Sequence, residues 1–317
     1  MPPTLAPPPP TLTSGITASG VRRTFGDVEA VRGLDLTARP GEITALVGPN
    51  GAGKTTLLLV LATLLVPDAG EVRVAGFDPV TQSDEVRARM GWAPDVFGIY
   101  DNVTAREYLE FVGAAYRLSK ADAARRAGEL LEISHLTEFA DRQVHVLSRG
   151  QKQRLGVSRA LVHRPAVLLL DEPAAGLDPR SRVDLRETLI GLAREGTTVL
   201  VSSHVLSDLE ELADRVVFVD KGVTVGEHRL DALPAAVTAR TWRLRALDMT
   251  ALVAALDRFR IAHDEPGPTG LDVELTSDEA AAELLGKLVR ARVAVVSSTP
   301  LGGALEAAYL DITTERR

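Results

Sequence analysis

Apolar positions in the first part of the chain come in short runs separated by turn residues, which is typical of β-structure. The runs predict strands at 28–37 and 42–47, and the second strand leads directly into a glycine-rich loop. Residues 55–65 then carry apolar side chains on nearly every side, as a buried helix does, and Pro67 ends that helix. The pattern therefore predicts a strand, a loop and a helix in direct succession.

The pattern changes to a helical period in the middle of the chain and then returns to strands. Helix-period apolar positions predict helices at 104–116, 120–133 and 150–163. Continuous apolar runs follow at 166–170, 197–202 and 216–220, and a helix is predicted at 179–195. Buried strands that alternate with helices indicate an α/β fold with a parallel sheet, which carries a helical subdomain at about 95–164.

A different pattern begins near Leu233 and Pro234. Predicted strands at 240–247, 271–276 and 293–298 are interleaved with predicted helices at 250–260, 277–289 and 301–311. The simplest interpretation is a small α+β accessory domain at 237–317, which follows a first domain at 15–236. Residues 1–14 are rich in proline and are expected to form a flexible arm.

Composition narrows the classes of function. The 317 residues are 45% hydrophobic and 25% charged, which is enough apolar material for two folded units. The formal net charge of -7 provides no general basic field, and the basic residues between 142 and 164 lack interleaved aromatic residues. We therefore expect no nucleic acid partner. The absence of cysteine excludes disulfides and thiolate metal sites.

Nothing in the sequence predicts a segment that crosses or enters a membrane. The apolar stretch at 57–66 has about half of the ~20 residues that a spanning helix needs, and Thr63 interrupts it. The N-terminus has no cationic start followed by an apolar block. We expect neither a transmembrane helix nor a signal peptide.

The glycine-rich loop fits the pattern G-x-x-x-x-G-K-[ST] and stands where that pattern requires, after a strand and before a helix. Its glycines let backbone N–H groups point at phosphates, and the helix N-terminus adds partial positive charge. Lys54 neutralises phosphate oxygens, and Thr55 offers a hydroxyl to Mg²⁺. The alternative is a glycine-rich turn with a surface lysine. The loop residues are Gly48, Pro49, Asn50, Gly51, Ala52, Gly53, Lys54, Thr55 and Thr56.

Two adjacent carboxylates end the apolar run at 167–170. The carboxyl end of a parallel strand faces the crevice where α/β sheets bind ligands. Asp171 can therefore hold Mg²⁺ through its water shell, while Glu172 takes a proton from the attacking water. By itself such a pair is more often a solvated strand end, and the presence of Lys54 favours the functional interpretation.

Three further motifs follow one another along the chain: Leu147-Ser148-Arg149-Gly150-Gln151, Ala175-Gly176-Leu177-Asp178, and His204 after the strand at 197–202. With the loop and the carboxylates, they make the chain resemble the nucleotide-binding subunits of ABC transporters over about residues 17–226. In that family the three motifs are the signature, the D-loop and the switch histidine. The resemblance implies a P-loop NTPase sheet with a helical subdomain and an N-terminal antiparallel β part.

The resemblance also implies ligands and roles. The cofactors would be ATP and Mg²⁺, with Thr55 and Asp171 at the metal and with Glu172 and His204 in catalysis. The rival interpretation of His204 is a capping or core histidine. The implied ATP-binding set is the nine loop residues together with Phe25, Ser148, Gly150, Gln151 and Asp178.

Phe25 stands where the family has an adenine-stacking aromatic residue, which is usually tyrosine. Stacking needs only the face of a ring, so phenylalanine should serve. A core aromatic residue is the rival interpretation, and the sequence leaves both open.

The signature has a physical meaning of its own. Ser148 is placed as the N-cap of the helix predicted at 150–163, and Gly150 lies in the first turn, so the helix start can hold an anion. By resemblance, this second site serves the γ-phosphate held by a different subunit. Two chains, as a homodimer or a pair of ATPase subunits, would then meet head to tail around two ATP molecules. Taken alone, Ser-Arg-Gly at a helix start is an ordinary cap.

Two positions depart from the usual pattern of the family. Asp95 stands where glutamine is common, and an aspartate could approach Mg²⁺ directly or through water while changing the charge of the site. Arg149 replaces the first glycine of the signature. We expect its side chain to point outward or to the partner's phosphates, because Ser148 and Gly150 are intact.

The resemblance implies an ATPase whose closure and reopening drive a separate membrane-spanning permease. The chain would lie peripherally at the cytoplasmic face of the membrane, with the permease docked on the helices after Asp95. One cassette followed by a small C-terminal domain looks most like the branch that exports drugs and polyketides. The alternative is a soluble ABC ATPase acting on ribosomes or DNA. Members that act on ribosomes would normally carry two cassettes in one chain, and members that act in DNA repair a long coiled coil between the nucleotide motifs. This sequence shows neither pattern, and the 117 residues from Lys54 to Asp171 (171 minus 54) are enough for a compact helical subdomain only.

Overall fold

The computed structural model describes residues 15–95, 98, 102–232, 240–301 and 305. Contacts divide the chain into two compact units, Met1–Arg229 and Leu230–Arg317. The predicted arm at 1–14 and the predicted boundary at 236/237 lie outside the described residues, and both stay predictions. The helix predicted at 301–311 likewise falls mostly outside them.

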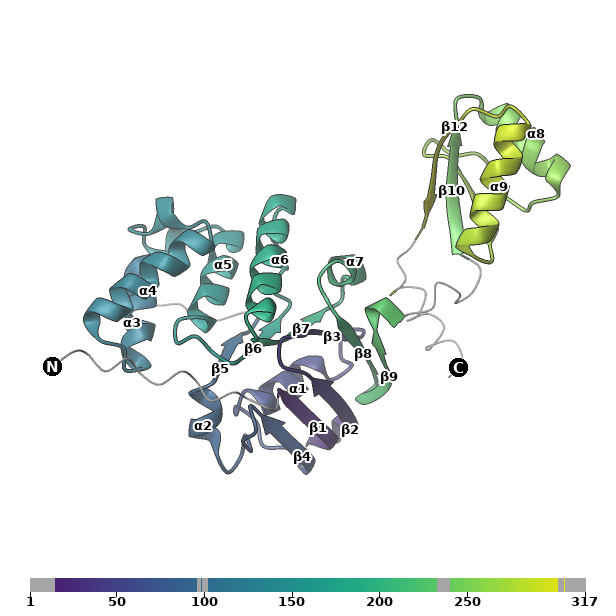
Figure 1. Cartoon of the computed structure of the whole chain (residues 1–317). Coiled ribbons are helices and arrows are strands. Elements are labelled where there is room, and N and C mark those ends of the chain that lie inside the picture. Colours follow the sequence, from purple (N-terminus) through teal and green to yellow (C-terminus); the bar gives the residue numbers. More distant parts are fainter. Residues whose placement is uncertain (1–14, 96–97, 99–101, 233–239, 302–304, 306–317) are drawn as a thin grey trace. The chain divides into compact units, whose positions relative to one another are not determined.

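The first unit begins with an antiparallel sheet of three strands in the order β2-β1-β4 (Figure 1). β1 (Ile16–Phe25) pairs with β2 (Val28–Ala38) and with β4 (Ala69–Val74). Buried and exposed residues largely alternate along β1, which is the pattern of a sheet covered on one face. The antiparallel part of the predicted fold is confirmed.

A second sheet has six strands in the order β5-β6-β7-β3-β8-β9, and only β9 runs antiparallel to its neighbour. Every residue of β3 and β6 is buried, which explains their continuous apolar runs. The loops after β3, β6 and β7 meet at one edge, because parallel strands share a carboxyl edge. The strands are β3 (Ile43–Val47), β5 (Met90–Ala93), β6 (Val167–Asp171), β7 (Thr198–Ser203), β8 (Arg215–Asp220) and β9 (Val223–Arg229).

The helix α1 (Lys54–Leu61) shares one core cluster with residues of both sheets. Leu57 and Leu61 of this helix are fully buried in that cluster, as its all-round apolar pattern predicts. The prediction that the helix reaches residue 65 is wrong. Thr63 has φ 63°, a left-handed conformation that does not continue a helix.

The predicted helical subdomain is confirmed as three helices, α3 (Ala105–Ala115), α4 (Lys120–Ile133) and α5 (Arg149–Ala160). The side chains of Thr104 and Ser119 cap the first two by accepting backbone N–H groups. Among the helices that the structure describes, none is both long and apolar enough to cross a bilayer. The remaining elements of this unit are α2 (Ser83–Arg87), α6 (Pro179–Arg194), α7 (Leu206–Glu210) and the 3-10 turns η1 (Thr137–Phe139) and η2 (Val144–Val146).

The second unit is a small α+β structure with its own core. After the 3-10 turn η3 (Leu230–Ala232), an antiparallel sheet in the order β11-β10-β12 carries two helices. Apolar residues of the sheet and of both helices form one cluster. The elements are β10 (Arg240–Ala246), α8 (Met249–Phe259), β11 (Leu271–Leu275), α9 (Asp278–Arg290) and β12 (Val295–Pro300). The strands and helices predicted between 240 and 298 are therefore present.

Candidate functional site

The loop between β3 and α1 packs closely against backbone on two sides. A Cβ atom at Gly48 would lie 2.2 Å from the carbonyl oxygen of Val219, and one at Gly53 would lie 2.7 Å from that of Ala30. Gly53 also has φ 100°, a conformation that residues with a side chain disfavour. Both positions therefore require glycine.

Lys54, the first residue of α1, folds back over this loop. Its Nζ donates to the carbonyl oxygens of Gly48 at 2.7 Å and Pro49 at 3.2 Å, and the residue is buried. Burial lowers the pKa of Lys54, whereas the carboxylates of Glu172 and Asp171 act in the opposite direction. The ammonium is held by neutral acceptors, which more strongly binding phosphate oxygens can replace.

Asp171, the last residue of β6, is buried, and both of its carboxylate oxygens accept a hydrogen bond. The hydroxyl of Thr55 donates to Oδ2 at 2.9 Å, and the hydroxyl of Ser202 donates to Oδ1 at 2.5 Å. The hydrogen bond from Thr55 thus connects α1 to the Asp171 carboxylate, which the sequence predicts to lie near the phosphate loop. These two bonds fix the orientation of the carboxylate.

Ser202 is a member of the site that the sequence analysis missed. It lies on β7, and the parallel register of β6 and β7 sets it directly beside Asp171. The same serine serves Glu172, whose backbone N–H donates to the Ser202 carbonyl oxygen at 3.1 Å and lies 3.2 Å from its hydroxyl. Its only signal in the sequence is its polarity within an apolar run.

Glu172 and His204 come together across the sheet edge. Oε2 of Glu172 lies 2.9 Å from Nδ1 of His204, a contact in which a protonated Nδ1 donates to the carboxylate. Glu172 has φ 50°, an uncommon conformation for a residue with a side chain, which turns the chain sharply after β6. The carboxylate side chain is 18% exposed and therefore open to a ligand in the crevice.

Asp171, Glu172 and Lys54 border one cavity of about 730 Å³, a size typical of small-molecule sites. Its lining includes loop residues 50–56, Asp95, Asp171, Glu172 and Lys221. The structure therefore brings residues 50–56 of the predicted phosphate loop, both predicted carboxylates and Asp95 to a single cavity, whereas Gly48, Pro49 and His204 are not among its lining residues. Lys221, in the turn between β8 and β9, also lines this cavity, and the sequence does not predict it as a site residue.

Phe25 is not among the residues that line this cavity. It ends β1 and is 45% exposed, and the guanidinium of Arg23 lies 5.0 Å from the centre of its ring. Val28, three residues further along, does line the cavity. The exposure argues against a core residue, and adenine stacking by Phe25 stays a prediction.

Ser148 caps α5, as the sequence predicts. Its hydroxyl accepts the backbone N–H of Gln151 at 3.2 Å, and the side-chain oxygen of Gln151 accepts the N–H of Ser148 at 2.8 Å. Gly150 lies in the first turn. These residues lie apart from the 730 Å³ cavity, because none of them belongs to its lining.

Asp178 has a structural role that the sequence analysis did not foresee. It caps α6 by accepting the backbone N–H of Ser181 at 3.0 Å and the hydroxyl of the same serine at 2.6 Å. These hydrogen bonds lower the pKa of the Asp178 carboxyl. In this structure the carboxylate orients the loop before α6.

Comparison with known proteins accounts for this arrangement. The family model described as ABC transporter matches residues 31–175. The chain is 33% identical over 307 residues to the daunorubicin/doxorubicin resistance ATP-binding protein DrrA of Streptomyces peucetius, covering 95% of this chain and 93% of that protein. It is 40% identical over 222 residues to DrrA3 of Streptomyces coeruleorubidus, covering 70% of each.

This chain belongs to the ABC transporter family.

Solved structures agree with that assignment. An ATP-binding subunit of an ABC transporter superposes with a TM-score of 0.65 at 26% identity, covering 69% of this chain and 92% of that one. An ATP-binding cassette solved as a dimer with ADP and Pi superposes with a TM-score of 0.63 at 28% identity, covering 68% and 98%. The chain is therefore an ATP-binding subunit with ATPase activity, and the predicted fold class is confirmed.

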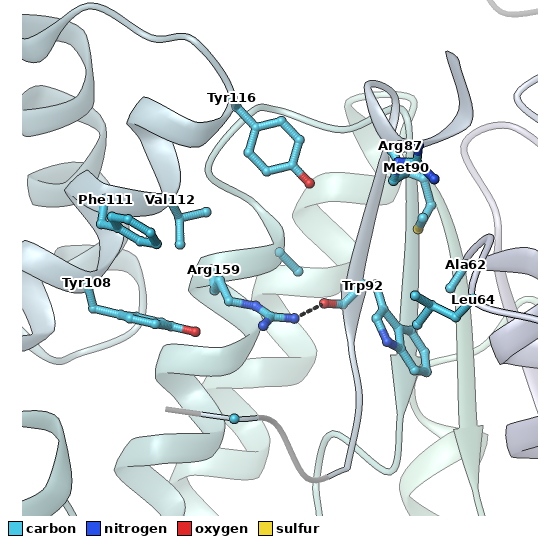
Figure 2. Close-up of a pocket in the computed structure, with 12 residues that line it drawn as sticks. Ala62, Leu64, Arg87, Met90, Trp92, Tyr108, Phe111, Val112, Tyr116 and Arg159 are labelled. Carbon is cyan, nitrogen blue, oxygen red and sulfur yellow. Dashed lines mark hydrogen bonds between the residues drawn. The ribbon is translucent and has the colours of Figure 1, made fainter. Parts of the chain in front are cut away.

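The ABC subunit has a second cavity, of about 620 Å³, between α3, α5 and β5 (Figure 2). Tyr108, Phe111 and Tyr116 of the helical subdomain line it together with Trp92 of β5. The Nη2 atom of Arg159 donates to the carbonyl oxygen of Trp92 at 2.9 Å. Aromatic side chains from the subdomain and a strand of the sheet thus enclose a largely apolar cavity.

His163 lies behind this cavity and is held neutral. Its ring stacks on Tyr116 with centroids 3.8 Å apart, Nε2 lies 3.2 Å from the carbonyl oxygen of Met90, and Nδ1 is buried without a hydrogen-bond partner. The contact with Met90 requires the tautomer protonated at Nε2. Burial lowers the pKa of His163 from 6.5 to about 4.

Acid should therefore destabilise the ABC subunit through His163. The unfolded chain binds a proton below about pH 6.5, whereas the folded histidine resists protonation down to about pH 4, so stability falls across this window. At 1.36 kcal/mol per pKa unit, the loss over the whole window is about 3 kcal/mol. The side chain of His163→Phe cannot titrate. Between pH 7 and pH 4.5, we expect the free energy of unfolding of this variant, measured by urea denaturation, to fall by about 2 kcal/mol less than that of the wild type.

The control is His145→Phe, which replaces an exposed histidine and should keep the pH dependence of the wild type. An equal loss of stability in the wild type and in His163→Phe would contradict the assignment.

Proposed function

We propose that this subunit hydrolyses ATP to drive a separate permease that exports a drug-like or hydrophobic small molecule. The observation that carries the proposal is the similarity to the daunorubicin/doxorubicin resistance protein, because it extends over 95% of this chain and so includes the second unit. Other relatives are named as the linearmycin resistance protein LnrL of Bacillus subtilis and a Nod factor export protein of Paraburkholderia xenovorans. All of these names describe resistance or export.

In the proposed reaction the loop at 48–56 binds the triphosphate of ATP through backbone N–H groups and through Lys54. Glu172 accepts a proton from the attacking water while the water oxygen bonds to the γ-phosphorus, and the bond from that phosphorus to the bridging oxygen breaks, so that ADP and phosphate are the products. The contact with His204 would keep the Glu172 carboxylate directed into the crevice, and the histidine would contact the γ-phosphate. The 2.9 Å separation between the two side chains supports this division of roles.

The residues present fit a magnesium ion. Within the described ranges, no three side chains of His, Asp or Glu gather into a site that could hold a metal by themselves. Mg²⁺ usually takes one or two carboxylates and completes its shell with water and phosphate oxygens. Thr55 and Asp171, which are joined by a 2.9 Å hydrogen bond, would hold the ion, and the ion would neutralise phosphate charge.

The proposed active form is a head-to-tail pair of subunits. Ser148, Gly150 and Gln151 stand at the start of α5, outside the cavity that contains the phosphate loop. A helix start with free N–H groups attracts anions. This surface would therefore meet the γ-phosphate bound by the second subunit. The dimeric cassette with ADP and Pi supports such a pairing.

The 620 Å³ cavity is the proposed docking place for the permease at the cytoplasmic face of the membrane (Figure 2). Phe111 lines the cavity and is 56% exposed, a large apolar side chain that a partner would cover. The strand β5 on the other side leads to Asp95, which lines the nucleotide cavity. A permease docked here would contact residues that a short segment, from β5 to Asp95, connects to the nucleotide cavity.

Phe111→Glu is expected to separate the subunit from its permease without stopping ATP hydrolysis. A charge in the apolar cavity disfavours docking, while the nucleotide cavity stays intact. We expect copurification with a polytopic membrane protein to fall by at least about 10-fold, a loss of about 1.4 kcal/mol in binding. ATP-dependent uptake of daunorubicin into inside-out vesicles that contain both proteins should fall with it.

The matched control is Ile133→Glu, which places the same charge at an exposed apolar position of α4, away from this cavity. It should leave copurification unchanged. Copurification of the wild type with ribosomes or DNA, and with no membrane protein, would instead favour the soluble ABC ATPase.

A further inference from the structure

The residue at which the signature departs from the family pattern packs on the D-loop of the same subunit. Arg149 is the first residue of α5, and Gly176 lies in the loop between β6 and α6. A Cβ atom added at Gly176 would lie 3.0 Å from Cδ and from Nε of Arg149, and 3.5 Å from its Cγ. The side-chain stem of the arginine therefore covers the face of Gly176 that has no side chain.

Two further approaches link the same helix to the same segment. A Cβ atom at Gly150 would lie 3.5 Å from the carbonyl oxygen of Gly176 and 3.5 Å from Cδ2 of Leu177. One turn later, the buried side chain of Gln153 places Nε2 3.5 Å from the carbonyl oxygen of Glu172. The first turns of α5 thus lie against the segment that runs from Glu172, the proposed general base, to the D-loop.

The shape of the D-loop explains why a long side chain fits there. Gly176 has φ 75°, a left-handed conformation in which residues with a side chain are strained. The stem of Arg149 fills the space above this bend, while Arg149 as a whole stays exposed. The guanidinium forms no ion pair within the part of the chain that the structure describes.

We infer that Arg149 is a positioning residue whose aliphatic stem holds the D-loop against the start of the signature helix. Both segments then meet the second subunit as one rigid piece. The inference rests on the proposed pairing of two subunits, and it assigns the effect to packing. A charge contact between Arg149 and the partner's phosphates is the competing explanation.

Three variants of the full chain separate packing from charge. Arg149→Met keeps a stem of similar length without the charge, Arg149→Lys keeps both, and Arg149→Ala removes both. We expect the Met and Lys variants to keep kcat for ATP hydrolysis within about 3-fold of wild type, and the Ala variant to lose about 10-fold. KM for ATP should stay unchanged in all three, because other residues form the subunit's own cavity.

Two results would overturn the inference. If the Met and Ala variants lose activity equally while Lys retains it, the charge and not the stem is responsible. If the Ala variant is as active as wild type, the position has no role. Arg194→Ala, an exposed arginine in the last turn of α6, is the control for a general effect of removing this side chain.

A double-mutant cycle tests the contact itself. The methyl group of Gly176→Ala would press on the Arg149 stem, so we expect kcat to fall by at least about 10-fold. Removing the stem in Arg149→Ala plus Gly176→Ala relieves this contact, so the double variant should lose at least about 3-fold less than the product of the two single losses. Losses that simply multiply would show no functional contact and would overturn the inference. Thermal unfolding of each variant confirms that it folds.

Failure of this inference can be told from failure of the proposed pairing. If the Glu172→Gln variant stays monomeric with ATP on a sizing column, the pairing fails whatever the Arg149 variants do. If that variant dimerises and the Met and Ala variants behave alike, only the role of Arg149 fails.

Discussion

Lys54→Ala is expected to lower ATP hydrolysis by at least about 100-fold, which is the usual cost of removing one preorganised charge from a phosphoryl-transfer site. The ammonium bonds the carbonyl oxygens of Gly48 and Pro49, which holds it at the loop. Its loss removes the principal cation from the loop. Tight binding of ATP should weaken as well, as a fluorescent ATP analogue would show.

The control for this variant is Lys120→Ala, which removes an exposed lysine at the start of α4 and should leave turnover unchanged. Normal hydrolysis by Lys54→Ala would refute the assignment of the phosphate loop. Thermal unfolding without nucleotide should show that both variants are folded.

Glu172→Gln should reduce kcat by about 10²–10⁴-fold, the range for loss of a general base. The amide cannot accept the proton from water, yet its oxygen can still accept a hydrogen bond from Nδ1 of His204, so the local geometry survives. ATP binding should therefore persist. Because the bound ATP is no longer consumed, the closed dimer should accumulate and elute at twice the monomer mass on a sizing column.

Glu187→Gln, on the exposed face of α6, is the matched control and should turn over ATP at the rate of the wild type. A Glu172→Gln variant that binds ATP but remains monomeric would count against the proposed pairing of subunits. A variant with full activity would remove Glu172 from the mechanism.

Several parts of the site follow from local sequence because local physics decides them. The glycine-rich motif before Lys54 is recognised as a phosphate loop when a strand precedes it and a helix follows it. The pattern of apolar residues predicts both elements. Asp171 is found in the same way, because a polar residue that ends a buried parallel strand lies at the ligand-binding edge. Ser148 follows from the preference for serine at a helix start.

Other expectations from sequence were incomplete because they depend on neighbours that are distant along the chain. Asp178 was assigned to ATP, whereas its carboxylate is engaged with Ser181 in the cap of α6. The sequence predicts that Arg149 points outward or to the partner, and the residue is exposed, but the packing of its stem on Gly176 is not predicted. Residues 27 positions apart along the chain (176 minus 149) carry no local signal of such a contact.

Local sequence is enough to predict the phosphate loop, the carboxylate pair and the order of motifs that places the chain among ABC subunits. Three contacts are visible only in the folded chain: Ser202 orients Asp171, His204 reaches Glu172, and Arg149 covers the D-loop. Periodicity and caps act over a few residues, whereas the strand order that sets β7 beside β6 depends on long-range pairing, which short patterns do not encode.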